Sequence, residues 1–453
     1  MRQTYTIVAE QRNIEHFFIC CYPPTLHCQL PAVSQVNRLL NRTLKERMMG
    51  QFDDIRPYDN SELSTVLTRL LHDPEFLQAI ANYRFPKLAK VAGWLIRPII
   101  SWQLKEKSRV IHSIEQLQRL IEDYIEKSIE QVTDGITLSG MEQLTADTAH
   151  LYISNHRDIV MDPALATYAM FQYQLDTPRI AIGDNLLQRP FVSDLMRLNK
   201  SFIVRRSVTG RKEKLEAFQQ LSAYINHSIT KDRQSVWIAQ AEGRAKDGND
   251  RTDSAILKML HISRKDEAFS EVVQSLSLIP IAISYEYDPC DLAKARELYI
   301  LATTGEYTKQ PGEDDQSIAL GITGYKGRVH IHFSDPITQP FTDTKALAKY
   351  IDQEIISHYR LFPVHYFAWH QWQARDQQLI VPSAEQLFST EEIAKAKSIW
   401  AERLANCPVE HQPFLIQQYA YPVQNLYQLQ QQLASAATTA DASSAPESTS
   451  EHE

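Results

Sequence analysis

The spacing of hydrophobic residues separates a helical region from a region of mixed structure. Between residues 61 and 132, apolar side chains recur every three or four positions in SELSTVLTRLLHDPEFLQAI (61–80) and IHSIEQLQRLIEDYIEKSIEQV (111–132), which predicts amphipathic helices. From about residue 148, short apolar runs alternate with helical stretches. These runs predict strands at 150–154, 179–183, 201–206, 235–240, 276–287 and 327–333, with helices between them, for example at 163–173, 184–199 and 210–229.

Alternation of strands and helices is typical of an α/β domain with a mostly parallel central sheet flanked by helices. We therefore expect helical N- and C-terminal additions around such a domain. The predicted regions are a mostly helical segment at 1–130, the α/β domain at 131–340, a helical region at 341–430 and a tail at 431–453. The tail is expected to be disordered, because its last stretch, ASAATTADASSAPESTSEHE, contains no large apolar side chain.

Residues 84–109, RFPKLAKVAGWLIRPIISWQLKEKSR, combine apolar and basic side chains. The segment holds seven Lys or Arg and one acid, Glu106, between side chains such as Trp94, Ile99 and Trp102. One interpretation is a buried helix kinked at Pro98. The other is a segment that lies in a membrane interface, with tryptophan as anchor and cations toward anionic lipid. The sequence leaves both open.

Composition narrows the possible environments and partners of this chain of 453 residues. Its formal charge of −8 argues against a general nucleic-acid binder, which needs a broad basic surface. We expect neither a secretory signal nor a transmembrane helix, because no apolar run is long enough. The cysteines form no paired framework or zinc pattern and are predicted to be reduced thiols in a cytosolic setting: Cys20, Cys21, Cys28, Cys290 and Cys407.

The clearest candidate for chemistry is LYISNHRDIVMDPAL (151–165), where a predicted strand ends in His156. His-Arg-Asp also occurs in protein kinases, but Pro163 occupies the position of their magnesium-binding Asn, and the glycine-rich loop and Asp-Phe-Gly are missing. Acyl transfer requires a base and an orienting acid, and His156 with Asp158 or Asp162 would supply them. The structural alternative is that Asp162 and Pro163 only begin the following helix.

Two basic loops also follow predicted strands. Arg205 and Arg206 end one strand, and alternation places them on opposite faces. The loop EGRAKDGNDRT (242–252) supplies glycines and cations that suit an anion, although a solvated surface loop has the same composition. His330 and His332 share one strand face without an evident third ligand, so no metal site is predicted.

Four stretches between about residues 148 and 290 resemble, in order, the blocks of the glycerolipid acyltransferase superfamily. They are SNHRDIVMD, KSFIVRRS, IAQAEGRAKDG and LIPIAISYE. The resemblance implies an α/β fold and transfer of an acyl chain from acyl-CoA or acyl-carrier protein to a hydroxyl. It implies no cofactor beyond the acyl donor, which is a substrate.

By that resemblance His156 is the base, Asp162 its orienting acid, Arg206 the residue that holds an acceptor phosphate, and Glu242 with Gly243 the acid and glycine of the third block. The pattern also departs from the family. Five residues instead of four separate His156 from Asp162, with Asp158 as a rival between them. Arg244 comes one residue before the family arginine and Lys246 one after, so both are candidate substrate-binding residues.

The leading hypothesis is an acyltransferase for a glycerol-phosphate or lysophospholipid acceptor. Two alternatives remain: a lipid-binding protein of the same fold with altered catalysis, and an acyltransferase for a lyso-lipid without phosphate. Because the product is a lipid, we expect a cytoplasmic protein attached peripherally to the inner face of a membrane.

Overall fold

The computed structural model describes residues 50–443. Internal contacts divide the chain into two units, Met1–Asp53 and Asp54–Glu453, and every element named below belongs to the second. Cys20, Cys21 and Cys28 lie outside the described residues, while Cys290 and Cys407 are free buried thiols.

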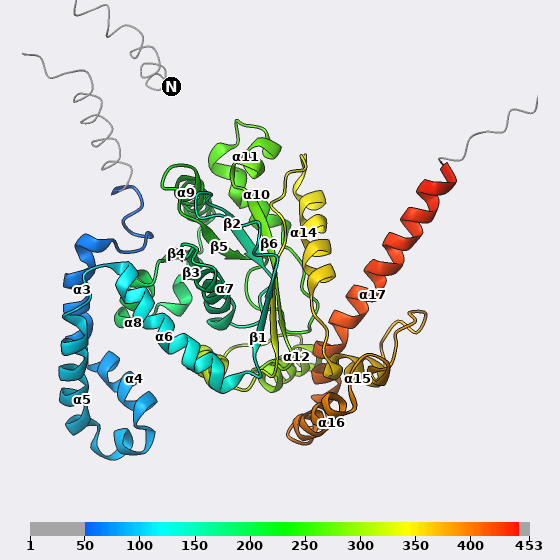
Figure 1. Ribbon diagram of the computed structural model, residues 1–453. Helices are drawn as coiled ribbons and strands as arrows, with labels where there is room; N and C mark the ends of the chain where they lie inside the picture. The colour runs from blue at the N-terminus through cyan, green and yellow to red at the C-terminus, as the bar shows by residue number, and fades with distance from the viewer. Residues whose placement is uncertain (1–49, 444–453) are drawn as a thin grey trace, which may run out of the picture. The chain divides into compact units, whose positions relative to one another are not determined.

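A seven-stranded sheet forms the centre of this unit (Figure 1). Its order is β1-β7-β6-β2-β5-β3-β4, and all neighbouring pairs are parallel except β6 with β7. The strands are β1 (Ile136–Ser139), β2 (Leu151–Ser154), β3 (Arg179–Gly183), β4 (Ser201–Val204), β5 (Val236–Ala239), β6 (Leu278–Tyr285) and β7 (Val329–Phe333). The predicted α/β class with a mostly parallel sheet is confirmed.

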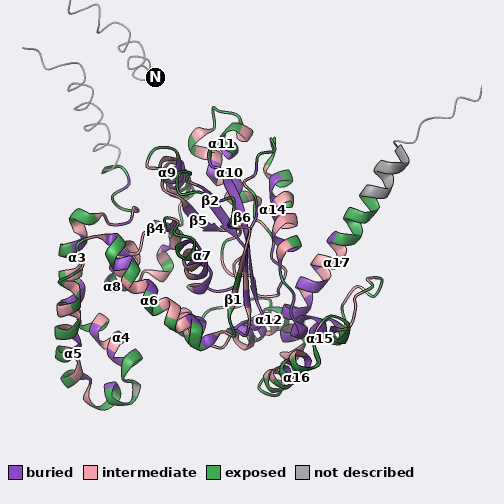
Figure 2. Ribbon diagram, viewed as in Figure 1, coloured by how far each residue is buried: buried purple, intermediate pink, exposed green. Residues whose placement is uncertain are grey.

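Helices flank the sheet, and its central strands are buried (Figure 2). On one face, Tyr152, Trp237 and Ile279 form a core with Met161 and Leu165 of α7. The helices of this region are α6 (Ile114–Val132), α7 (Met161–Gln172), α8 (Pro190–Leu198), α9 (Arg211–Thr230), α10 (Ser254–His261), α11 (Phe269–Ser275), α12 (Asp291–Thr304), α13 (Glu313–Thr323) and α14 (Thr344–His358). Short 3₁₀ turns are η1 (Asp184–Leu186) and η2 (Ile262–Arg264).

Three helices precede α6: α3 (Asn60–His72), α4 (Pro74–Arg84) and α5 (Pro86–Ser108). The single helix predicted at 61–80 is divided, because Asp73 caps α4 and Pro74 cannot continue α3. In α5 the non-helical backbone falls at Ala92, and Pro98 lies inside the helix, so the kink expected at Pro98 is misplaced. No helix within residues 50–443 is long and apolar enough to cross a membrane.

The C-terminal helices are α15 (Pro363–Gln371), α16 (Thr390–Ala405) and α17 (Gln412–Ser443), with the 3₁₀ turn η3 (Ala384–Gln386) between the first two. They share an aromatic core that includes Tyr366, Trp369, Trp400 and Tyr419. Since α17 continues to Ser443, the helical region extends beyond its predicted end at 430, and only the part of the predicted tail at 444–453 lies outside the described residues.

The six predicted strands are all present, and one strand was missed. β1 at Ile136–Ser139 has a weakly apolar sequence, ITLS, and lies at the sheet edge beside β7. The helix predicted at 184–199 is interrupted at Pro190, where α8 begins after η1. Helix α9 agrees with the prediction at 210–229 to within one residue at each end.

Candidate active site

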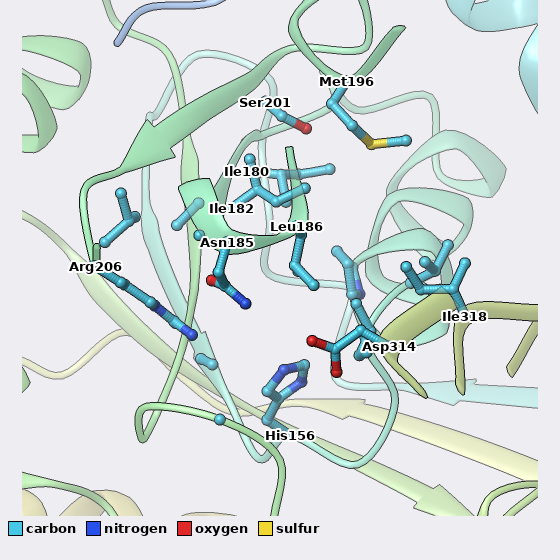
Figure 3. Close-up of a pocket in the computed structure, with 18 of the residues that line it drawn as sticks. His156, Ile180, Ile182, Asn185, Leu186, Met196, Ser201, Arg206, Asp314 and Ile318 are labelled. Atoms are coloured by element: carbon cyan, nitrogen blue, oxygen red, sulfur yellow. The ribbon is translucent and has the colours of Figure 1, made fainter. Parts of the chain in front are cut away.

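The candidate residues meet because parallel strands end at the same edge of a sheet. His156 follows β2, Arg206 follows β4 and Glu242 follows β5. All three line one cavity of about 1350 Å³. Figure 3 shows the Arg206 side chain extending toward His156 from across this cavity. Loops at the carboxyl ends of parallel strands are a common location for binding sites in α/β proteins.

His156 and Asp162 form the central contact of the site. The distance from His156 Nδ1 to Asp162 Oδ2 is 2.8 Å, and Asp162 is fully buried. Asp162 lies in the first turn of α7, so a six-residue separation returns its carboxylate to the histidine. The longer spacing within the first block therefore preserves a His–Asp pair.

The partners of Asp162 determine which ring nitrogen of His156 carries the proton. Its Oδ2 atom also accepts hydrogen bonds from the backbone N–H groups of Arg157 (2.6 Å) and Asp158 (2.8 Å). Its Oδ1 atom accepts one from the Tyr285 hydroxyl (2.6 Å). Because Asp162 acts as an acceptor throughout, we assign the His156 proton to Nδ1, which leaves Nε2 as a free base.

Asp158 was a candidate to orient His156, but its hydrogen bonds give it a different role. Its Oδ1 atom accepts the backbone N–H groups of Val160 (3.0 Å) and Met161 (2.9 Å) at the start of α7. Burial and the charge of Asp162 raise the pKa of Asp158. Asp162, and not Asp158, contacts the His156 ring, so Asp158 takes the helix-capping role expected of Asp162.

The neighbours of His156 fix the loop that carries it. Asn155 is fully buried and exchanges two hydrogen bonds with the backbone of Ile283 in β6 (2.9 and 2.8 Å). Arg157 forms a buried ion pair with Asp250 (2.7 Å). The His156 carbonyl accepts the backbone N–H of Ala245 (2.8 Å), which ties this loop to the third sequence block.

Arg206 is positioned by residues at the end of β3 as well as by β4, which it follows. Asp184 accepts the backbone N–H of Arg206 (3.0 Å) and that of Ser207 (3.2 Å). Burial alone would raise the pKa of Asp184, but hydrogen bonds from Ser207 and these amides outweigh it and lower the pKa. A side chain at Gly183 would come within 3.1 Å of Arg206 Cδ, so this glycine leaves room for the guanidinium. Strand β4 ends at Val204, before either arginine, and Arg205 instead pairs with Asp54.

The third-block residues line the same cavity and differ in their exposure and their partners. Glu242 is 71% exposed at its side chain and lies 3.8 Å from Arg206 Nε. Gly243 has φ near 80°, a conformation that favours glycine. Arg244 has a buried Nη1 atom without a hydrogen-bond partner in the described structure, which makes it a candidate cation for a ligand. Lys246 pairs with Glu297, and burial lowers its pKa.

Three contributors lay outside the predicted set: Tyr285, Asp184 and Gly183. Each follows or ends a strand at the same sheet edge, which is the sequence signal that could have identified them. Within residues 50–443, no group of three or more His, Cys, Asp or Glu side chains is arranged to hold a metal ion. His330 and His332 both bond to Ser139 Oγ (3.2 and 2.8 Å).

Comparisons with known proteins show what this chain resembles. The family model described as Acyltransferase matches residues 135–284. A glycerol-3-phosphate acyltransferase of Pseudoalteromonas translucida is 27% identical over 233 residues, 49% of this chain and 26% of that protein. A human dihydroxyacetone phosphate acyltransferase is 24% identical over 189 residues, 41% of this chain and 26% of that protein. The chain thus spans about a quarter of the length of these curated relatives.

A crystal structure of a 1-acyl-sn-glycerophosphate acyltransferase from Thermotoga maritima is also similar, with 14% identity and a TM-score of 0.33 over 62% of this chain and 95% of that one. The matched family region contains β1 to β5, all but the last residue of β6, and the residues His156, Asp162, Arg206 and Glu242. Residues 135–284 therefore form an α/β acyltransferase domain. Over this domain the chain is similar to the glycerolipid acyltransferase superfamily.

Proposed function

We propose that this protein transfers a fatty acyl group from acyl-CoA or acyl-carrier protein to a hydroxyl of a glycerol-phosphate or lysophospholipid-type acceptor. The observation that carries the proposal is the His156–Asp162 pair at the wall of a large cavity, with Arg206 across from it. The curated relatives are named for glycerol-3-phosphate and dihydroxyacetone phosphate, both phosphate-bearing acceptors.

In the proposed reaction, His156 Nε2 removes the proton of the acceptor hydroxyl while the oxygen attacks the thioester carbonyl. The carbonyl becomes a tetrahedral oxyanion, the C–S bond breaks, and the thiolate takes the proton back from the imidazolium. Asp162 orients the ring and stabilises its charged form. Arg206 and Arg244, which both line the cavity, would hold the acceptor phosphate, and Glu242 would orient Arg206.

Replacement of His156 by Ala tests this mechanism. We expect the folded variant to lose about 10²- to 10⁴-fold in kcat, because a positioned general base contributes that much. The control is His370→Ala, which removes an exposed imidazole that lies outside the cavity. Products from labelled acyl donors and an acceptor panel would be identified by mass spectrometry.

Three results would revise the proposal. Wild-type turnover in folded His156→Ala would show that His156 is not the general base. Product only from acceptors without phosphate would favour a different lyso-lipid, such as one that contains an amino acid. Tight lipid binding by the wild-type protein without any product would favour a lipid-binding protein of this fold.

We also propose that the protein works at the cytoplasmic, inner face of a membrane and docks through α5. Large apolar side chains of this helix are exposed, including Val91 (84%), Trp94 (67%) and Trp102 (63%). Lys87, Lys90 and Lys105 are exposed on the same helix. Only part of α5 is buried, at residues such as Ala89 and Ile100, and the exposure of the rest supports the membrane-interface interpretation over the buried helix.

Flotation with anionic liposomes tests the docking proposal. We expect Lys87→Gln with Lys90→Gln to weaken binding about 30-fold at low salt, because each cation near an anionic surface contributes about 1 kcal/mol. The matched control neutralises two exposed lysines of α14, Lys345 and Lys349. Equal flotation of both double variants and the wild type would contradict docking through α5.

A further inference from the structure

The cavity beside His156 extends well beyond the space needed for the reacting groups. Figure 3 shows Ser201 and Met196 at the end opposite His156, with Ile180 and Ile182 between. The walls are largely apolar, with contributions from α6, β3, α8 and α13 such as Ile125, Ile180, Ile182, Leu195, Met196 and Ile322. A chain of methylene groups would bury its surface along such walls.

A carboxyl oxygen in this wall has no hydrogen-bond partner among the described residues. Glu122 of α6 lines the cavity and is 6% exposed. Its Oε1 atom is buried and accepts no hydrogen bond from any described residue. By contrast, buried Asp162 accepts four hydrogen bonds and buried Asp291 is paired with Arg403 and Tyr419. An unpaired carboxyl oxygen in an apolar wall is a free energy cost that a ligand donor would remove.

The surroundings of Glu122 favour its uncharged form. Burial, followed by the negative charges of Glu126 and Asp123, raises the pKa of Glu122 to about 8. A protonated carboxyl group combines a donor and an acceptor and needs no counter-ion in an apolar cavity. Gln118, one turn earlier on α6, also lines the cavity but is occupied by a hydrogen bond from Thr177 (3.0 Å). Glu122 therefore remains available to a ligand.

We propose that the acyl-binding part of the cavity is adapted to a chain that carries a hydroxyl group, and that Glu122 hydrogen-bonds this hydroxyl. The inference rests on the proposed acyl transfer and specifies its donor as a hydroxyacyl thioester. A hydroxyl group fits this site because it can donate a hydrogen bond to Glu122 Oε1 and brings no charge into the apolar wall. Glu122 acts as a specificity-determining residue that contacts the acyl chain and takes no part in the proton transfer at His156.

The test compares saturated acyl thioesters of one length with a series bearing a single hydroxyl at successive carbons. We expect the wild-type protein to favour at least one hydroxylated chain about tenfold in kcat/KM, since a hydrogen-bonding site rejects an analogue that leaves its group unpaired. Glu122→Leu should abolish that preference and increase the turnover of the unsubstituted chain. Glu122→Gln, which keeps an acceptor oxygen, should retain part of it. Glu130→Leu is the control, because Glu130 is exposed on α6 and does not line the cavity.

Binding of non-reactive thioether analogues of the same chains, measured by calorimetry, separates this inference from the proposed function. Preferential binding of a hydroxylated analogue that depends on Glu122 would support the inference even without turnover. Equal kcat/KM for all chains in the wild type, or a hydroxyl preference that persists in folded Glu122→Leu, would overturn it while acyl transfer itself stood. In that case an ordered water would be the partner of Glu122.

Discussion

At the scale of single residues, the two acids near His156 differ in what they bond. Asp162 accepts hydrogen bonds from the imidazole Nδ1 and from three further donors, whereas Asp158 accepts them from the backbone N–H groups of Val160 and Met161, where α7 begins. One oxygen of Asp158 is buried without a partner, and a side chain at Gly321 would lie within 2.3 Å of it. The sequence offered both acids as candidates, and their hydrogen bonds assign them separate roles.

This difference predicts unequal effects of two matched substitutions. Asp162→Asn should lower kcat by about 10²-fold or more, because a neutral amide cannot stabilise the imidazolium and its NH2 group can turn the imidazole to the wrong tautomer. Asp158→Asn should change kcat by only a few fold, because the amide oxygen can still cap α7. Steady-state kinetics on both folded variants would measure the contrast, and equal losses would contradict the assignment.

At the scale of elements, residues at the end of β3 help to position Arg206, which follows β4. Strands β3 and β4 are parallel neighbours with Gly183 opposite Val204, so the residues that follow each strand are adjacent. The backbone of Gly183 has φ −69° and ψ 139°, which any residue can adopt. Its lack of a side chain matters because the added carbon would lie 2.4 Å from Asn185 Oδ1 and 3.1 Å from Arg206 Cδ.

Gly183→Ala should therefore displace Asn185 and crowd the Arg206 side chain without straining the strand. We expect the KM for a phosphate-bearing acceptor to rise about tenfold, as for a weakened charge-assisted hydrogen bond, with a smaller change in kcat. Acceptors without phosphate should be affected less. If both acceptor types show the same change, Arg206 does not hold the phosphate.

At the scale of the whole molecule, buried charges join the C-terminal helices to the acyltransferase region. Arg403 of α16 pairs with Asp291 of α12, which also accepts the hydroxyl of Tyr419 in α17. Asp291 is 1% exposed, and burial raises its pKa despite the nearby Arg403. Lys294 of the same helix bonds to the Arg157 carbonyl (2.8 Å), beside His156. The C-terminal helices thus contribute to the framework beneath the site.

Arg403→Met should destabilise the protein by about 3–5 kcal/mol near neutral pH, because it leaves Asp291 buried without its cation. The raised pKa of Asp291 should rise further in this variant. A group with a raised folded-state pKa contributes stability below its unfolded pKa and loses it as pH increases. The deficit should therefore be smaller at pH 5 than at pH 8 in urea unfolding, and Asp291→Asn added to Arg403→Met should reduce it at pH 8.

The sequence by itself determined the elements whose signals are local. Six strands and the main helices follow from hydrophobic periodicity, and the four blocks identified His156, Asp162, Arg206 and Glu242 because their order along the chain is itself a pattern. The helix boundaries at Asp73-Pro74 and Arg189-Pro190 also have a local signal, because proline cannot continue a preceding helix.

Tertiary structure decided what depends on distance between segments remote in sequence. The hydrogen bond from Tyr285 to Asp162 joins residues 123 positions apart, and the edge strand β1 gains its place only by pairing with β7. The exposed face of α5 and the unpaired carboxyl of Glu122 are likewise properties of packing. Periodicity reports which side chains can be buried together, whereas hydrogen-bond partners and solvent exposure exist only once the segments have come into contact.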